Sequence, residues 1–165
     1  MSDTTTDTGT DAGSDTETGT GETAAPTGPT IGFAQQYVKD LSFESPQSPK
    51  IFMSQMAQPD VHVDFNVAAE PVENNIHEVV LDIEVKATLN DETMFIAELS
   101  YAGLVQVTNA ADDVLKQILM IEAPRHLFPF ARAILAEAIR DGGFPPLLLN
   151  PIDFQGYYRQ TQQNA

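Results

Sequence analysis

The chain has 165 residues, of which 42% are hydrophobic, and its formal net charge is −16 at pH 7. This length predicts one folded domain with accessory segments, and the charge argues against binding to DNA phosphates or anionic lipid. The chain contains no cysteine, which excludes disulfides, thiol catalysis and thiolate metal sites. On the ground of this charge we expect no nucleic-acid binding. We also expect no membrane insertion, because no apolar run has membrane-spanning length. The N-terminus does not resemble a secretory signal.

Residues 1–30 consist mostly of Thr, Asp, Gly, Ser and Glu, with six acidic residues and no basic one. Such a segment buries too little apolar surface to offset the entropy of ordering. We therefore expect residues 1–30 to be a disordered acidic tail and residues 31–165 to be the folded domain. The domain keeps 18 acidic and 8 basic residues, a net charge of −10, so most of the acidity belongs to it.

Four segments, 37–44, 60–67, 77–89 and 94–101, alternate apolar and polar residues. Period-two alternation is typical of antiparallel strands with one buried face. Asn90-Asp91-Glu92 is predicted to be the turn of a hairpin between the last two strands. In the last strand Phe95, Ala97, Leu99 and Tyr101 share one face, whereas Met94, Ile96, Glu98 and Ser100 share the other. All four polar sets can lie on one sheet face, which would be strongly acidic.

The period then changes to that of helices. Apolar residues at helical spacing predict a helix over 110–122 that Pro124 ends, with acidic residues at its start that suit the helix dipole. A longer, alanine-containing helix is predicted to have Pro129 in its first turn and to stop at Gly142-Gly143. Its apolar stripe is broad enough for an oligomer interface as well as the sheet. A short helix is expected over 152–162, so the fold class is α+β, an antiparallel meander followed by helices.

Between these last two helices lies the apolar segment 142–154, GGFPPLLLNPIDF. Its three prolines disfavour both an interior helix and a central strand, so it should be largely irregular. It is either an ordered loop that covers the core or, because contiguous exposed apolar surface is typical of recognition, part of a binding site.

No catalytic motif stands out. The three histidines have no metal-ligand spacing, Gly142-Gly143 lacks the residues of a phosphate loop, and no serine lies in a nucleophile elbow. We therefore expect no enzyme activity, no cofactor and no metal. The acidic sheet face is left with two interpretations, a solvated surface or a docking site.

Four stretches resemble the SecB protein-export chaperones. They are YVKDLSFESPQSPKIF (37–52), HEVVLDIEVKATLNDETMFIAEL (77–99), LFPFAR (127–132) and FPPLLLNPIDF (144–154), in the same order, within a similarity over roughly residues 33–160. The resemblance implies a cytoplasmic homotetramer, a dimer of dimers with the long helix in its core. Such a chaperone holds unfolded precursor polypeptides and passes them to the ATPase SecA, without nucleotide or catalysis of its own.

The resemblance also implies two sets of site residues. The client polypeptide would contact Val61, Val63, Phe65, Phe144, Leu147, Leu149, Phe154 and Tyr158. The basic, zinc-binding C-terminal tail of SecA would contact Asp40, Glu44, Ile96 and Glu98. The alternation of the strands predicts the same acidic face independently.

Pro146 and Leu148 stand where many relatives have polar residues, which leaves the client preference open. A SecB-like chaperone dedicated to the antitoxin of a toxin–antitoxin system is the alternative function. A small enzyme for apolar ligands is a third, for which no convergent polar site is visible.

Overall fold

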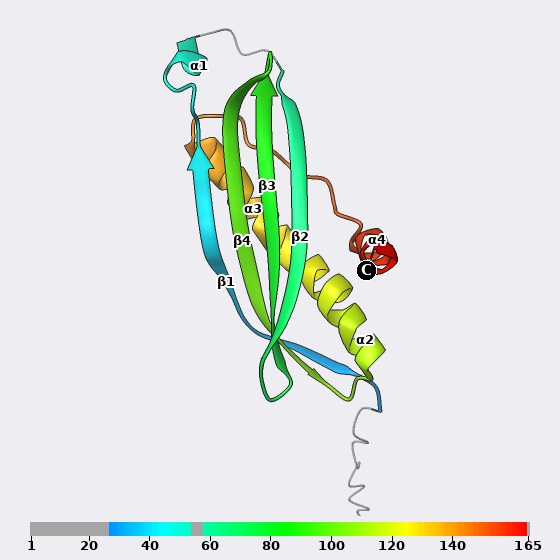
Figure 1. The fold of residues 1–165 in the computed structure, drawn as a ribbon. Coiled ribbons are helices and arrows are strands. Elements are labelled where there is room, and N and C mark those ends of the chain that lie inside the picture. The colour runs from blue at the N-terminus through cyan, green and yellow to red at the C-terminus, as the bar shows by residue number, and fades with distance from the viewer. Residues whose placement is uncertain (1–26, 54–57, 165) are drawn as a thin grey trace, which may run out of the picture.

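Four long antiparallel strands form one twisted sheet in the order β1-β4-β3-β2 (Figure 1). The computed structural model describes residues 27–53 and 58–164, so most of the predicted acidic tail lies outside the described part. The strands are β1 (Thr30–Glu44), β2 (Asp60–Glu73), β3 (Ile76–Leu89) and β4 (Glu92–Thr108). The predicted antiparallel sheet, followed by a long helix and a shorter C-terminal helix, is confirmed.

The meander, however, contains three strands and not four. β2, β3 and β4 follow one another through two tight hairpins, and both turns use residues with positive φ, Asn74-Asn75 and Asn90-Asp91. β1 pairs with β4 on the far side of the meander. Alternation shows which face of a strand is buried but not which strand lies beside it, so the sequence pattern could not place β1.

β1 and β4 are also longer than predicted. β1 begins at Thr30 and β4 continues to Thr108, and these added ends pair with each other from Thr30↔Thr108 to Phe33↔Val105. Their alternation is weak because Gly32 and Gly103 carry no side chain to pack. Cross-strand hydrogen bonding extends both strands beyond what their side chains indicate.

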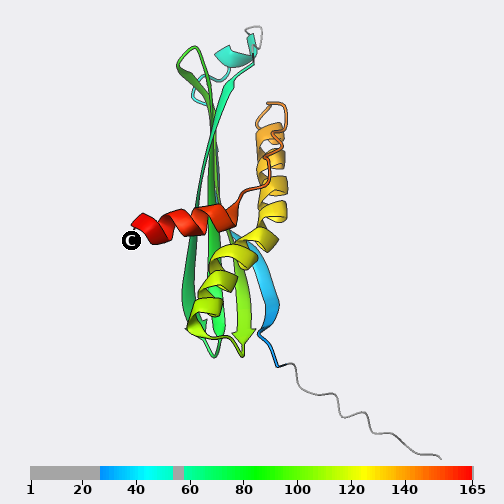
Figure 2. The same ribbon diagram turned by 90° about the vertical axis from the view of Figure 1, so that its right-hand side faces the viewer.

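One face of the sheet packs on a long helical segment that crosses it diagonally (Figures 1 and 2). The helices are α1 (Lys50–Met53), α2 (Asp112–Gln117), the π-turn η1 (Ile118–Glu122), α3 (Ala123–Asp141) and α4 (Phe154–Asn164). In the core, Leu81, Ile83 and Leu99 from the sheet and Leu127 and Leu135 from α3 are almost fully buried. None of the described helices has the length and apolar character needed to cross a membrane.

Neither proline of this segment acts as predicted. Pro124 does not end the first helix, because α2, η1 and α3 run on without a break. The N–H of Ala123 donates to the carbonyl of Ile118, five residues back. This wider turn makes room for the ring of Pro124, which in a regular helix would clash with the carbonyl of Met120. Pro129 is likewise inside α3 and not in its first turn.

The end of α3 lies against the end of β1. An added Cβ at Gly142 would stand 2.2 Å from the ring of Phe43, and Gly143 has φ +91°. Only glycine allows the close contact at Gly142 and the left-handed backbone at Gly143. The chain then turns back as an irregular segment, 144–153, that leads to α4, as the prolines predict.

Candidate functional site: an apolar groove and an acidic sheet face

Three hollows follow one another between β2 and the irregular segment 144–153. Their volumes are about 440, 340 and 330 Å³. The first is lined by Gln58, Pro59, Val61, Met94, Phe95, Phe144, Pro145, Pro146 and Leu147. The second is lined by Val61, Val63, Phe65, Leu147, Leu148, Leu149, Asn150 and Ile152. The third is lined by Phe65, Ile152, Asp153, Gly156, Tyr157 and Gln160.

The hollows are continuous, because each shares walls with the next. Val61 and Leu147 line both the first and the second, and Phe65 and Ile152 line both the second and the third. We call this row of hollows the β2 groove. Alternate residues of a strand lie about 7 Å apart, so Val61, Val63 and Phe65 supply one wall at regular intervals.

The three leucines of the irregular segment differ in exposure. Leu149 is buried (8% exposed), Leu147 is half-buried, and Leu148 is 77% exposed. Arg132 of α3 holds the segment in place, because its Nη1 donates to the carbonyl oxygen of Leu149 at 3.3 Å. The guanidinium of Arg132 also lies 5.8 Å from the centre of the Phe128 ring. Leu148 therefore offers the largest free apolar surface of the three.

Two of the aromatic residues assigned to the client belong to the core. Phe144 is 4% exposed and lies 4.9 Å from Phe95 between ring centroids. Phe154 is 1% exposed and meets the ring of Phe65 edge-on. Tyr158 is half-buried and lines none of the three hollows. Phe144 still borders the first hollow, whereas Phe154 supports the groove from beneath.

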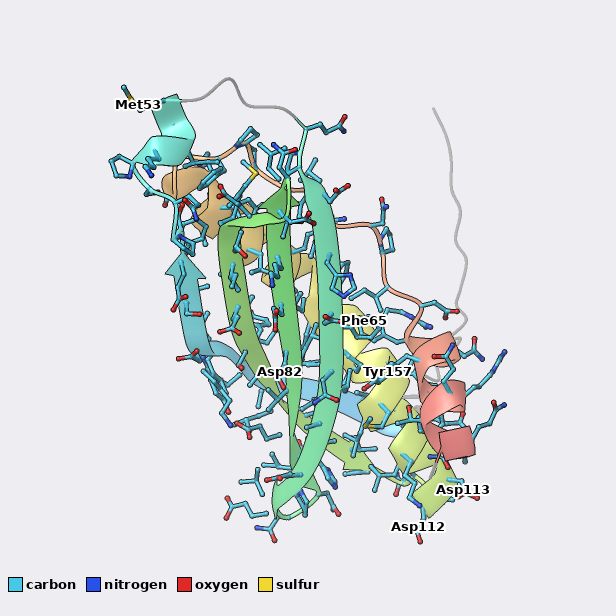
Figure 3. The ribbon with its side chains drawn as sticks, turned by 45° about the horizontal axis from the view of Figure 1, so that its top comes forward. Met53, Phe65, Asp82, Asp112, Asp113 and Tyr157 are labelled. Atoms are coloured by element: carbon cyan, nitrogen blue, oxygen red, sulfur yellow. The ribbon has the colours of Figure 1, made fainter. Side chains whose placement is uncertain are left out.

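Tyr157, which sequence reasoning left unassigned, lies at the end of the groove. Its ring centroid is 4.9 Å from that of Phe65, and its hydroxyl donates to Oδ1 of Asn66 at 3.0 Å. Figure 3 shows Tyr157 on α4 facing Phe65 on β2. Helical spacing marks Tyr157 and Tyr158 as equally plausible contacts, so only the packing of α4 distinguishes them.

Met94 does not lie on the sheet face that the sequence predicts for it. It was expected on the polar face, yet it is 2% exposed and lines the first hollow. The pairing of β3 with β4 passes from Ala87↔Phe95 to Thr88↔Thr93, which leaves Met94 as an unpaired bulge residue. A bulge changes the direction of the side chains around it, and alternation does not reveal it.

The other face of the sheet is acidic, as predicted. A hollow of about 370 Å³ on this face is lined by Asp40, Asp64, Phe65, Asn66, Asp82, Ile83, Glu84, Glu98, Leu99 and Ser100. Among the predicted SecA contacts, Asp40 and Glu98 border this hollow, and Glu44 pairs with Ile96 along the same two strands. We call this surface the acidic face; Asp82 is labelled on it in Figure 3.

Like charges face one another across the strands of the acidic face. Glu98 pairs directly with Glu84, and Glu84 pairs directly with Asp64. Opposed like charges destabilise a sheet, and a hydrogen bond from Ser42 to Glu98 at 3.1 Å offsets only part of that repulsion. The arrangement attracts cationic groups. Among the described residues, no cluster of His, Asp or Glu has the geometry to hold a metal ion.

β2 belongs to both surfaces. Its side chains Val61, Val63 and Phe65 line the groove, whereas Asp64 and Asn66 line the hollow of the acidic face. One strand thus carries an apolar binding surface and a charged one on opposite faces.

Comparisons with known proteins identify the family to which the chain is similar. The family model described as "Preprotein translocase subunit SecB" matches residues 24–165. The protein-export protein SecB of Sphingopyxis alaskensis is 52% identical over 139 residues, which cover 84% of this chain and 80% of that protein. The SecB of Afipia carboxidovorans is 48% identical over 146 residues, which cover 88% of this chain and 89% of that protein.

A solved structure shares the fold. It is a SecB-like chaperone of Mycobacterium tuberculosis in complex with a ChAD peptide from the HigA1 antitoxin. The TM-score is 0.63 at 12% sequence identity, over 74% of this chain and 90% of that one. At this identity the likeness concerns the fold alone.

Proposed function

Because this chain belongs to the SecB family of protein-export chaperones, we propose that its β2 groove holds unfolded precursor polypeptides until they are exported. The observation that carries this proposal is the continuity of three hollows along β2, the first two lined mostly by apolar side chains, which accommodate an extended chain better than a compact ligand. The action is binding and release, without catalysis.

Burial of apolar side chains supplies the affinity. Each buried Å² contributes about 25 cal/mol, and Leu148 and Val61, which are 77% and 41% exposed, offer free apolar surface for it. Ordering an unfolded chain costs entropy. A single groove therefore binds weakly, and tight holding of a long precursor requires several grooves at once. This requirement favours the homotetramer typical of the family, in which four grooves act on one client.

Transfer to SecA would use the acidic face. Carboxylates such as Glu98 and Glu84 oppose one another there, and the basic tail of SecA would relieve that repulsion. Because exposed charges are screened by salt, this contact should weaken as ionic strength rises. A chaperone that meets precursors before export works in the cytoplasm, where we place this protein.

The relatives with about 50% sequence identity to this chain are named protein-export proteins. These names favour a function in export over a chaperone dedicated to one antitoxin. The antitoxin complex is similar in fold alone and lends the alternative no support.

A refolding assay tests the proposal. Chemically unfolded precursor of a slow-folding exported protein is diluted into buffer with or without an equimolar amount of the chaperone tetramer. We expect the chaperone to delay refolding until SecA or excess unfolded competitor is added. An unchanged refolding rate, with no precursor bound on gel filtration, would disprove the proposal.

A further inference from the structure

The side of α3 that faces away from the sheet carries apolar surface. His126, Phe130 and Ile134 follow one another at four-residue spacing, which places them on one face of the helix. His126 is exposed, Phe130 is 48% exposed and Ile134 is half-buried, whereas Leu127 and Leu135 are fully buried in the core. The described residues of the chain therefore leave much of this helix face uncovered.

The start of β1 widens this surface. The imidazole of His126 stacks on the ring of Phe33, with 4.1 Å between the ring centroids and 26° between the planes, and its centroid lies 6.1 Å from that of Phe130. A hollow of about 410 Å³ beside the stack is lined by Ile31, Phe33, Glu122, Arg125 and His126. We call the surface formed by these five residues, Phe130 and Ile134 the α3 face. His126 belongs both to its hollow and to its exposed helix strip.

The charges of the α3 face suit a second copy of the chain. Residues 31–165 include 18 acidic and 8 basic residues, so two copies repel each other in most orientations. Residues 123–136 of α3 differ, because they include Arg125, His126 and Arg132 and no acidic residue. Glu122 pairs with Arg125 at 2.8 Å at the edge of this face. In a two-fold contact each arginine can also meet the glutamate of the other copy, so two copies can approach here with little repulsion.

The charge balance of the α3 face depends on His126. Glu122 and Arg125 neutralise each other, and none of the ion pairs found in the described part of the chain includes His126. Residues 30–36 of β1 and 102–108 of β4 have no ionisable side chain. On β3, the residue in the row of Phe33 is His77, which can only add positive charge. A protonated His126 would therefore be an uncompensated cation.

Protonation has different consequences in the free and in the associated chain. In the free chain His126 is exposed, so water solvates an imidazolium there. A second copy on the α3 face would remove that water and add a second imidazolium to the same interface, and both changes cost free energy. A neutral imidazole has neither cost and keeps its apolar stacking on Phe33. Histidine is the side chain that ordinarily changes its charge near neutral pH. Association should thus release protons and weaken on acidification.

We propose that the α3 face joins two copies of the chain and that His126 makes this association sensitive to protons. The contact is strong when the imidazole is neutral and weak when it is protonated. This inference rests on the proposed homotetramer, to which it adds a regulatory residue. Because tight holding of a precursor uses several grooves at once, acidification would also lower the affinity for clients by dividing the assembly.

Sedimentation velocity of the full-length protein tests this inference over a wide range of concentrations and at constant ionic strength. The two conditions, about pH 7.5 and about pH 5.5, lie on either side of the titration of histidine. His126→Leu keeps an apolar side chain without a proton site, and His126→Lys carries a charge in both conditions. His62→Gln is the matched control, because His62 is exposed on β2, at the opposite edge of the sheet from β1.

We expect the dissociation constant of the wild-type assembly to rise roughly tenfold or more from the higher to the lower pH, and that of His126→Leu to change by less than about threefold. His126→Lys should associate weakly in both conditions, and His62→Gln should respond as the wild-type protein does. The sign separates His126 from the carboxylates, because their protonation lowers the net negative charge and so favours association. Circular dichroism melts check that each variant is folded.

A wild-type assembly that is equally strong or stronger at the lower pH would overturn the inference, and so would a His126→Leu variant that keeps the wild-type response. The precursor refolding assay is run in parallel at the higher pH. If precursor is held while association ignores pH, only the role of His126 fails. If the protein sediments as a monomer in both conditions, the proposed homotetramer fails and this inference fails with it. If precursor is not held, the holding function itself fails.

Discussion

The hydroxyl of Tyr157 on α4 donates a hydrogen bond to the side-chain oxygen of Asn66 on β2, 3.0 Å away. Tyr157 closes one end of the apolar groove, and Asn66 belongs to the acidic face on the other side of the sheet. This contact is therefore a direct link between the two surfaces, and it holds α4 at the edge of β2.

We expect Tyr157→Phe to loosen α4 without removing its apolar contact with Phe65. Loss of one partly exposed hydrogen bond should cost about 0.5–1 kcal/mol, and amide hydrogen exchange in α4 should become several-fold faster. Tyr158→Phe is the matched control, because no hydrogen bond of its hydroxyl occurs among the described residues. Equal exchange rates in the two variants would contradict the anchoring role of Tyr157.

Leu148 and Leu149 are adjacent, yet aspartate should affect them in opposite ways. Leu148 is 77% exposed, so Leu148→Asp should change the free energy of unfolding by no more than about 0.5 kcal/mol while weakening precursor binding roughly tenfold. Leu149 is 8% exposed, and an unpaired carboxylate there should cost about 3 kcal/mol or more. Chemical denaturation and precursor titration measure the two effects.

Leu148→Asn separates lost apolar surface from added charge, since it removes the side chain without introducing a carboxylate. Loss of precursor binding in Leu148→Asp but not in Leu148→Asn would show that charge, and not burial, caused the first result.

Glu98→Lys should weaken binding of the basic SecA tail and leave precursor binding intact. Glu98 lies opposite Glu84, so its reversal both removes an attractive carboxylate and relieves the repulsion that favours a cationic partner. Isothermal titration with the tail peptide, at low and high salt, measures the loss. Glu73→Lys changes the net charge equally about 30 Å away along the sheet, and an equal loss in that variant would point to overall charge in place of a docking site.

A hydrogen bond from Tyr37 to Glu78 should make stability depend on pH at low pH. This bond, with help from Lys39, lowers the pKa of Glu78 below its ordinary value of 4.5. A carboxyl whose folded-state pKa is lowered contributes stability above its unfolded pKa and loses it as pH falls through the folded one. The difference in melting temperature between the wild-type protein and Tyr37→Phe should therefore be constant near neutrality and shrink below pH 4.5.

The same bond raises the pKa of Tyr37 above its ordinary value of 10.0. Stability that depends on the protonated hydroxyl is present below that value and is lost as pH rises through the raised pKa. The difference between the two proteins should shrink again in strongly alkaline buffer, and a difference that is the same at every pH would contradict the assigned pair.

Local sequence patterns determined the two-faced character of the sheet. In β3, Leu81 and Ile83 are buried as their alternation predicts, and Asp82 and Glu84 lie on the acidic face. The prolines likewise determined that residues 144–153 would be irregular, because a residue without an N–H supports neither helix nor ladder. Four ordered stretches were enough to identify the family, which the relatives confirm.

Only the tertiary structure decided which residues of those patterns meet. The place of β1 beside β4, the bulge that buries Met94 and the π-turn that admits Pro124 each depend on a hydrogen-bonding partner that the period of one segment does not reveal. The same holds for the leucines of the irregular segment, since Arg132 on α3 donates to the carbonyl of Leu149, and Leu149 is buried whereas its neighbour Leu148 is exposed. The period of the apolar residues and the composition of a segment show which of its faces is apolar and which is polar. Packing and hydrogen bonding in the folded protein decide which residues each face contacts.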